Sequence, residues 1–209
     1  MSGFAEYSQK LINKYKKKYK VPIVVANDEN IKKYGRLIKT YDEYLLEDVI
    51  IKKWPKTKGR AICIGTGTGG GITEGYFKFW KDGNYYKSKN ESKNESYISG
   101  VLTNNQTIIT REANYHPDSS QVFYPLINSP YILLLALPGD DVKLEKFIGF
   151  YFDGKCGIHI FPDVWHQPIF PINGIGKLKN KQGSVHACVK VDILEEFKTW
   201  LEIDITSCF

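Results

Sequence analysis

From residue 60 onward the chain consists of short apolar runs, which glycine, asparagine and proline interrupt at close intervals. Runs of this length between turn-forming residues are typical of β-strands, and many of them in close succession favour a β-sandwich or barrel over βαβ units. The predicted strands cover 60–64, 74–80, 97–102, 107–112, 120–126, 130–137, 156–161, 165–172 and 184–192. The sequence therefore predicts a mainly β protein.

The last of these runs alternates as a strand with one buried face does. Valine and alanine occupy one side, and polar residues occupy the other: Val185, Ala187, Val189 and Val191 against His186, Cys188, Lys190 and Asp192. A strand is the expected conformation, with the second set facing away from the core.

Helices are expected only at the periphery. Residues 4–20 carry apolar side chains at a spacing near 3.6 among many lysines, which predicts a basic amphipathic helix over about residues 1–20. Shorter helices are predicted over 28–34, 42–48, 140–152 and 193–200. Residues 21–209 then form a single domain. The repetitive polar segment KSKNESKNES (87–96) predicts a solvated loop, within a flexible insertion at about 84–97.

The composition excludes several classes of protein. A hydrophobic content of 42% supports a packed core, and no apolar run reaches the roughly 18 residues that a membrane span needs. The N-terminus lacks an apolar signal segment, and the four cysteines form no CxxC pair. We therefore expect reduced thiols, a cytoplasmic location and no cysteine-based zinc site.

The net charge of +6 raises the question of nucleic-acid binding. Much of the excess lies in lysines at 14–20 and 52–58, and arginine occurs only at Arg36, Arg60 and Arg111. A lysine-rich helix face is usually just solvated, so nucleic acid is not the expected partner. An RNA-associated protein would instead show salt-dependent heparin retention that disappears when residues 1–20 are removed.

The segment CIGTGTGGG (63–71) contains a formal GxGxxG pattern after a strand. A dinucleotide site would need a helix next, but ITEGYFKFW follows and resembles another strand. Two interpretations stay open: a mobile loop over a pocket, which we favour, and a phosphate cradle.

Two segments carry the candidate chemistry. In NYHPDSSQVFYPL (114–126), His116 precedes a turn and Gln121 begins a strand, sharing one face of it with Phe123. In GIHIFPDVWHQPIFP (157–171), His159 and His166 lie on interrupted strands. Each histidine could be a satisfied structural residue. If the imidazoles and the glutamine converge, they would form an acid–base or metal site.

These segments resemble the ureidoglycolate lyase family, whose members are cupin-like β-barrels. The resemblance rests on His-Pro followed by Gln-x-Phe-x-Pro, on a later Trp-His-x-Pro, and on weaker matches elsewhere; the residues are His116, Pro117, Gln121, Phe123, Pro125, Trp165, His166, Gln167 and Pro168, with Tyr34–Ile38, Tyr131–Leu137, 144–150, Gly154, Gly157 and Val189–Asp192. It spans about residues 28–205. It implies a cupin-like β-barrel or sandwich with a few peripheral helices.

The family has nothing like the basic helix at 4–20 or the loop at 87–96, and two single positions also depart from its pattern. The family's acidic residue two positions before the histidine is Asn114 here, and many members have histidine where this chain has Phe161. Both positions concern the polar lining, so the fold transfers more safely than the substrate.

The resemblance implies a lyase that cleaves ureidoglycolate to glyoxylate and urea, a step of allantoin and purine degradation. His116 and His166 would share the acid–base work, and Gln121 would orient the substrate carboxylate. Trp165 would wall the pocket, and Lys190 or Arg111 would supply positive charge. A divalent metal is conceivable, with His116, Gln121 and His166 as candidate ligands.

Asn114 and Phe161 favour an alternative, a non-catalytic cupin that binds a small carboxylate metabolite. A homodimer is expected by analogy with cupin-like domains.

Overall fold

The computed structural model describes residues 6–41, 60–63, 66–67, 70–91, 95–103, 106–139, 141–167 and 169–208. Its strands are β1 (Lys18–Lys20), β2 (Ile23–Val25), β3 (Gly35–Ile38), β4 (Ile72–Asp82), β5 (Tyr85–Asn90), β6 (Glu95–Leu102), β7 (Thr107–Thr110), β8 (Glu112–Tyr115), β9 (Gln121–Pro125), β10 (Tyr131–Ala136), β11 (Ile148–Phe152), β12 (Gly157–Ile160), β13 (Trp165–His166), β14 (Phe170–Pro171), β15 (Ile175–Gly183), β16 (Val189–Asp192) and β17 (Trp200–Asp204). The helices are α1 (Gln9–Lys14), α2 (Asp28–Ile31) and α3 (Ile193–Phe197), with 3₁₀ turns η3 (Leu144–Lys146) and η4 (Ile205–Cys208). The mainly β class is confirmed.

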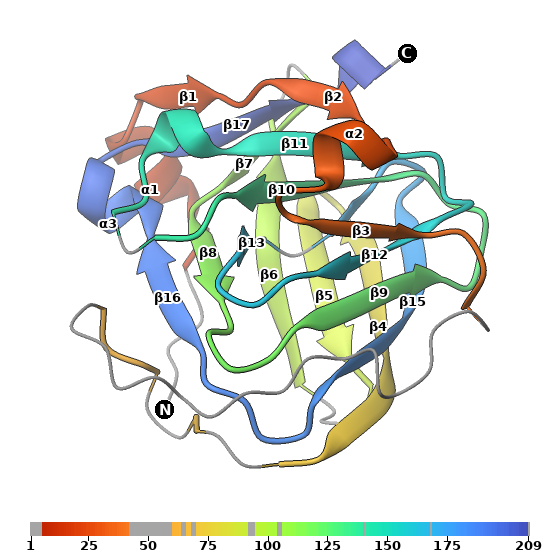
Figure 1. The fold of residues 1–209 in the computed structure, drawn as a ribbon. Coiled ribbons are helices and arrows are strands. Elements are labelled where there is room, and N and C mark those ends of the chain that lie inside the picture. The colour runs from red at the N-terminus through yellow and green to blue at the C-terminus, as the bar shows by residue number, and fades with distance from the viewer. Residues whose placement is uncertain are drawn as a thin grey trace.

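The described strands form two sheets. The larger has ten strands in the order β1-β17-β7-β6-β5-β4-β15-β9-β12-β3, and the smaller has the order β16-β8-β13-β10-β11-β2, with β14 paired to β10. In Figure 1 the larger sheet curves from β17 and β7 at the upper left, through β6, β5 and β4, to β9, β12 and β3 at the right. This curved sheet against a smaller one is the sandwich expected of a cupin-like fold.

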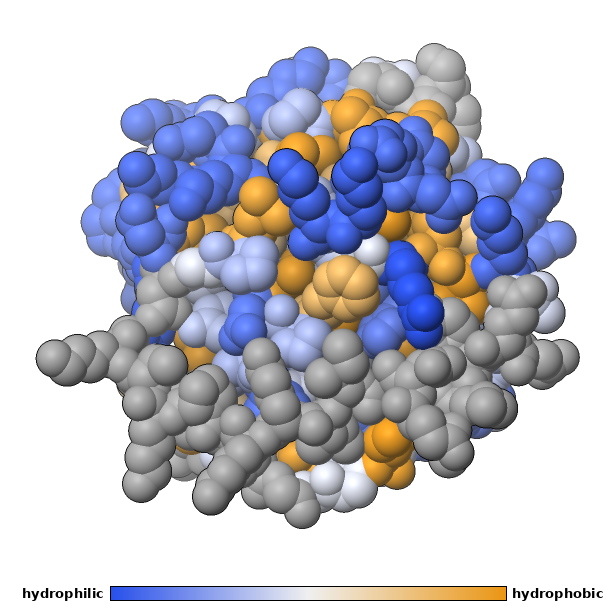
Figure 2. Space-filling model, viewed as in Figure 1, coloured by the Kyte–Doolittle hydropathy of each residue, from blue (hydrophilic) through white to orange (hydrophobic). Residues whose placement is uncertain are grey.

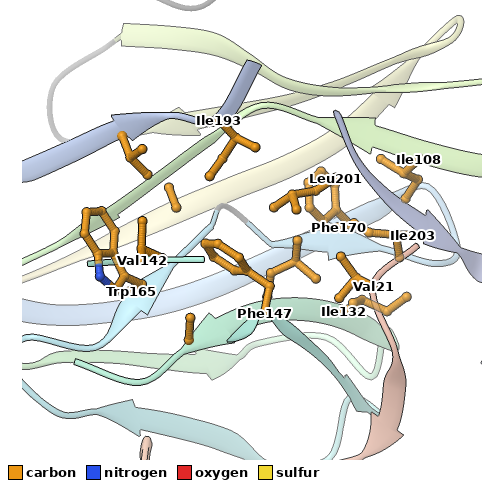
Figure 3. Packing of buried hydrophobic residues seen from close by; sticks show 14 of the residues in the cluster. Val21, Ile108, Ile132, Val142, Phe147, Trp165, Phe170, Ile193, Leu201 and Ile203 are labelled. Atoms are coloured by element: carbon orange, nitrogen blue, oxygen red, sulfur yellow. The ribbon is translucent and has the colours of Figure 1, made fainter. Parts of the chain in front are cut away.

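Both faces of β10, in the middle of the smaller sheet, are buried. On one face, Ile132 and its neighbours pack with Ile108 of β7 and Leu201 and Ile203 of β17 (Figure 3). On the other, Leu133 and the alternate residues of β10 pack with residues of β9, β12 and β15. Because β10 is covered on both sides, its residues are all apolar rather than alternating. On the molecular face in Figure 2, hydrophilic side chains surround smaller apolar areas.

The predicted N-terminal helix is much shorter than expected. Ser8 caps α1 by accepting a hydrogen bond from the Leu11 N–H, and the helix ends at Lys14. Lys18–Lys20 instead form β1, which pairs in parallel with β17. Val21 follows β1 into the core, so the basic segment alternates between solvent and core as a strand does. The segment is therefore built into the larger sheet.

The predicted helix over 140–152 is wrong. Among the described residues 141–152, only η3 is helical, and residues 148–152 form β11, antiparallel to β10. Phe150 and Phe152 face one core and Phe147 the other. Apolar residues on both sides of a buried strand matched a helical spacing by coincidence.

Other expectations differ in extent. The predicted loop at 87–96 is largely strand, because β5 and β6 pair from Tyr85 to Asn90 and from Glu95 to Val101. The strand β15, with its mostly polar sequence, was not predicted at all. The last predicted helix ends at Phe197 as α3, and β17 follows. The helix expected over 42–48 lies outside the described residues. Within the described chain, no helix is long and apolar enough to cross a membrane.

Candidate functional site

A pocket of about 220 Å³ lies between the two sheets. Its lining combines a few aromatic rings with many amide and imidazole groups: Phe77, Phe79, Asn90, Tyr97, Asn114, His116, Gln121, Phe123, His166, Gln167, Gln182, His186 and Cys188. Ligand pockets for drug-sized molecules are usually larger than about 300 Å³, so this one suits a small polar metabolite.

His116 follows the end of β8 and is held from one side. Its Nδ1 donates to the carbonyl oxygen of Ala187 at 2.9 Å. The Ala187 N–H in turn donates to both carboxylate oxygens of Asp118, at 2.9 and 3.1 Å. The buried Asp118 thus fixes the backbone group that fixes the imidazole.

His166 reaches the same place from the smaller sheet. It lies on β13, opposite Asn114 of β8, and its Nδ1 donates to the carbonyl oxygen of Val164 at 2.9 Å. The rings of His116 and His166 lie 5.2 Å apart between centroids. The two histidines, 50 residues apart along the chain, therefore line one pocket as predicted.

Asn114 joins the two imidazoles. Its Nδ2 lies 3.1 Å from Nε2 of His166 and 3.5 Å from Nε2 of His116. A backbone carbonyl only accepts hydrogen bonds, so each Nδ1 carries the hydrogen and each Nε2 keeps a lone pair. The Asn114 amide donates to these lone pairs. The sequence comparison treated Asn114 only as a departure, whereas the structure makes it the centre of the cluster.

A third imidazole was missed as a site residue. The His186 ring lies 4.4 Å from that of His116, and its Nδ1 donates to the carbonyl oxygen of Gly183 at 2.7 Å. The alternation of 184–192 had placed His186 on the polar side of its segment. The predicted strand is formed only over Val189–Asp192, and Val185 is exposed, so the strand prediction was wrong for 184–188. His186 precedes the strand and lines the pocket, which no local pattern showed.

Burial sets the charge of the cluster. It lowers the pKa of His116 well below the ordinary 6.5, and the neighbouring His166 and His186 lower it further. Burial also lowers the pKa of His166 to about 4. Both imidazoles are therefore neutral at pH 7 in the ligand-free pocket.

Gln121 lines the pocket together with Phe123, as their shared strand face predicted. Its Nε2 donates to Oδ1 of Asn180 at 2.9 Å, and its side chain also stabilises the protonated form of His116. Gln121 is thus held in place beside the histidine pair.

Trp165 is next to His166 but faces the opposite side of β13. Its ring is fully buried in the core against Tyr115, with ring centroids 4.6 Å apart. Its Nε1 donates to the Gly139 carbonyl oxygen at 2.8 Å. Trp165 is therefore a core residue that anchors β13, and it does not line the described pocket.

The two predicted cations differ in position. Arg111 forms a two-pronged ion pair with Asp192, and its Nη1 donates to the Glu6 carbonyl oxygen at 2.9 Å. Lys190 lies opposite Asn114 in the strand register, with its Nζ 2.5 Å from the Glu112 carboxylate. Both cations are thus paired with carboxylates, and neither lines the pocket.

The remaining sequence candidates lie elsewhere. His159 is buried on β12, opposite Arg36 and Val122, outside the pocket lining. Phe161 packs against the His159 ring at 5.7 Å. The glycine-rich segment 63–71 is only partly described, and Gly70 approaches the Val185 backbone so closely that a Cβ there would lie 2.4 Å from its nitrogen.

The donor set does not suit a metal ion. Among the described residues, no three His, Cys, Asp or Glu side chains are placed to share one. The Nε2 atoms of His116 and His166 already accept from the Asn114 amide, and no described carboxylate lines the pocket. The amides of the lining, Gln121 among them, are only weak metal ligands.

The ureidoglycolate lyase family model matches residues 81–196, more than half of the chain. The ureidoglycolate lyase of Pseudomonas savastanoi pv. phaseolicola is 35% identical over 57 residues, which cover 27% of this chain and 34% of that protein. The enzyme of Salmonella enteritidis PT4 is 30% identical over 63 residues, 30% of this chain and 39% of that protein. The alignments thus cover only about a third of the curated relatives' length.

Proposed function

The chain belongs to the ureidoglycolate lyase family, and from this premise we propose that it cleaves the C–N bond of ureidoglycolate to give glyoxylate and urea. The observation that carries the proposal is a pair of neutral imidazoles in a small polar pocket, each with an unprotonated Nε2 directed at the Asn114 amide.

The reaction needs one proton to move. The substrate hydroxyl loses its proton, the C–O bond becomes a carbonyl, and the C–N electron pair leaves with the urea nitrogen, which takes up a proton. In the proposal, an Nε2 of His116 or His166 accepts the hydroxyl proton, and the pair returns it to the departing nitrogen. The low pKa of His166 favours the second transfer, since its imidazolium is a strong donor.

The substrate itself supplies a negative charge. A carboxylate bound near the imidazoles would raise their pKa, which makes them better bases in the complex than in the free protein. The amides of Gln121, Gln167 and Gln182 line the pocket and offer donors to that carboxylate. Lys190 and Arg111 are not needed in this arrangement, because both are paired with carboxylates.

The test is glyoxylate formation from racemic ureidoglycolate, with and without added divalent metal ions. We expect His166→Asn and His116→Asn to lower kcat by about 10²-fold or more while Tm stays close to that of the parent protein. His159→Asn, which removes a buried imidazole outside the pocket, is the matched control and should keep its activity.

One observation favours the alternative function, binding of a small carboxylate without catalysis. Asn114 replaces the family's acidic residue and donates to both Nε2 atoms, which lowers their basicity. No glyoxylate above the buffer rate under any metal condition would refute the lyase. Calorimetric binding of glyoxylate or oxalate that His166→Asn abolishes would then support the alternative.

A further inference from the structure

Two cysteines that are 125 positions apart lie side by side next to the pocket. Ile62 and Val189 form an antiparallel bridge, and the Cys63 N–H donates to the Cys188 carbonyl oxygen at 2.7 Å. This register places Cys63 directly opposite Cys188. Opposite residues in an antiparallel pair have Cα atoms about 4.5–5.5 Å apart, which is within the range that a disulfide spans.

Thr66 ties the two backbones together. Its hydroxyl donates to the Cys63 carbonyl oxygen at 2.8 Å and accepts from the Cys188 N–H at 3.2 Å. The juxtaposition of the cysteines is therefore held by three hydrogen bonds rather than by a single contact.

The side chains also face each other. The Cys188 thiol donates a hydrogen bond to the Cys63 sulfur, which is the main reason that the pKa of Cys63 is lowered to about 6 and that of Cys188 is raised. Lys190 favours the Cys63 thiolate, and Glu112 opposes it. Cys63 and Cys188 are both half-buried, so a small oxidant can reach them.

We propose that Cys63 and Cys188 form a redox modification site, at which a hydroperoxide converts the thiol pair into an intramolecular disulfide. The Cys63 thiolate attacks one peroxide oxygen, and the O–O bond breaks to give a sulfenic acid and, with one proton, water. The Cys188 thiol then attacks that sulfur, and the S–O bond breaks to release a second water. Two thiols lose two electrons, and one hydrogen peroxide gains them.

This inference does not depend on the proposed function. Because Cys188 lines the pocket beside His186, the modification would act on the pocket wall whatever ligand binds there. Cys156 provides an internal comparison, since burial raises the pKa of its thiol.

The first test is to treat the reduced full-length protein with stoichiometric hydrogen peroxide and to map the peptides by mass spectrometry. We expect a cross-linked peptide that contains Cys63 and Cys188 and is about 2 Da lighter than the two reduced peptides together, since one disulfide removes two hydrogens. Dithiothreitol should reverse the cross-link. Oxidation of Cys156 or Cys208 ahead of Cys63, without this cross-link, would overturn the proposal.

The second test uses variants to separate the two roles. In Cys188→Ser, Cys63 should form a sulfenic acid that dimedone traps, because the resolving thiol is absent. In Cys63→Ser, Cys188 should react slowly, and Cys156→Ser should behave as the parent protein. At pH 6 iodoacetamide should modify Cys63 about tenfold faster than Cys156, and equal rates would contradict the inference.

Discussion

At the scale of single residues, the candidate site consists of imidazoles whose Nδ1 atoms donate to backbone carbonyl oxygens. The His-Pro and Trp-His motifs predicted that His116 and His166 belong to one site, and the structure brings their rings to 5.2 Å. The motifs could not show that Asn114 contacts both Nε2 atoms, because that contact depends on how β8 and β13 pair. Burial keeps both histidines neutral, and the Asn114 amide contacts the unprotonated Nε2 of each.

Asn114→Asp should raise the pKa of both histidines, that of His166 by at least about one unit from about 4. The reason is that a carboxylate stabilises an imidazolium, whereas the amide donates to the neutral form. NMR titration of the imidazole resonances between pH 3 and 8 measures the change. Asn114→Leu, which is similar in size and uncharged, should leave the His166 pKa low. Equal values in the two variants would show that Asn114 does not control the pair.

At the scale of elements, Arg111 and Trp165 illustrate how a residue type can mislead. Both were predicted to serve the pocket, but each stabilises the junction of its strand with a neighbour. Arg111, between β7 and β8, joins the N-terminal segment through the Glu6 carbonyl and α3 through its N-cap Asp192. Asp192 also caps α3 by accepting from the Glu195 N–H at 3.0 Å.

Asp192→Ala should therefore destabilise the fold by about 2–4 kcal/mol, because it removes a helix cap and takes the two-pronged carboxylate partner from a buried guanidinium, to which only the exposed Glu195 carboxylate at 3.7 Å then remains. Urea unfolding measures the loss. Glu29→Ala, which removes an exposed ion pair with Lys32, should cost less than about 1 kcal/mol and serves as the control. If the two variants lost similar stability, the Arg111 ion pair would have no special structural role.

At the scale of the whole molecule, the buried histidines link the fold to pH. The folded-state pKa of His166 is about 4, below its ordinary 6.5, so the unfolded chain binds the proton more tightly. The neutral histidine costs nothing above pH 6.5, and stability falls as the pH drops from there towards 4. His116 acts in the same direction, and Glu112, whose pKa burial raises, acts in the opposite one.

His166→Asn should remove about 3 kcal/mol of the stability difference between pH 7.5 and pH 4, as the size of the pKa shift requires. Urea unfolding of the parent protein and the variant at both pH values isolates this contribution from that of Glu112. An identical pH dependence in the two proteins would mean that burial does not lower the pKa of His166.

The homodimer, the cytoplasmic location and the single domain over 21–209 stay predictions. The basic N-terminal segment, however, has acquired a structural role. Its strand β1 extends the larger sheet, and the nearby Tyr7 hydroxyl donates to the Ser99 carbonyl oxygen at 2.9 Å. Loss of heparin retention on removing residues 1–20 would therefore not by itself identify RNA binding, because the same deletion removes part of the fold.

Much of the architecture was already determined by the sequence alone. Short apolar runs between turn residues specify strands through local backbone preference. The alternation separates buried from polar residues only over 187–192, since Val185 is exposed and the strand begins at Val189. The ordered His-Pro, Gln-x-Phe-x-Pro and Trp-His-x-Pro motifs identified the family, which the match over residues 81–196 bears out.

Only the tertiary structure decided the features that depend on which strands become neighbours. It covered both sides of the segment 147–152, so that Phe147 and Phe150 pack into different cores where the local spacing indicated a helix. It also brought His186 to His116 and Cys63 to Cys188. Local patterns encode period and turns, but a contact between distant segments depends on strand order and register, which no short stretch of sequence contains.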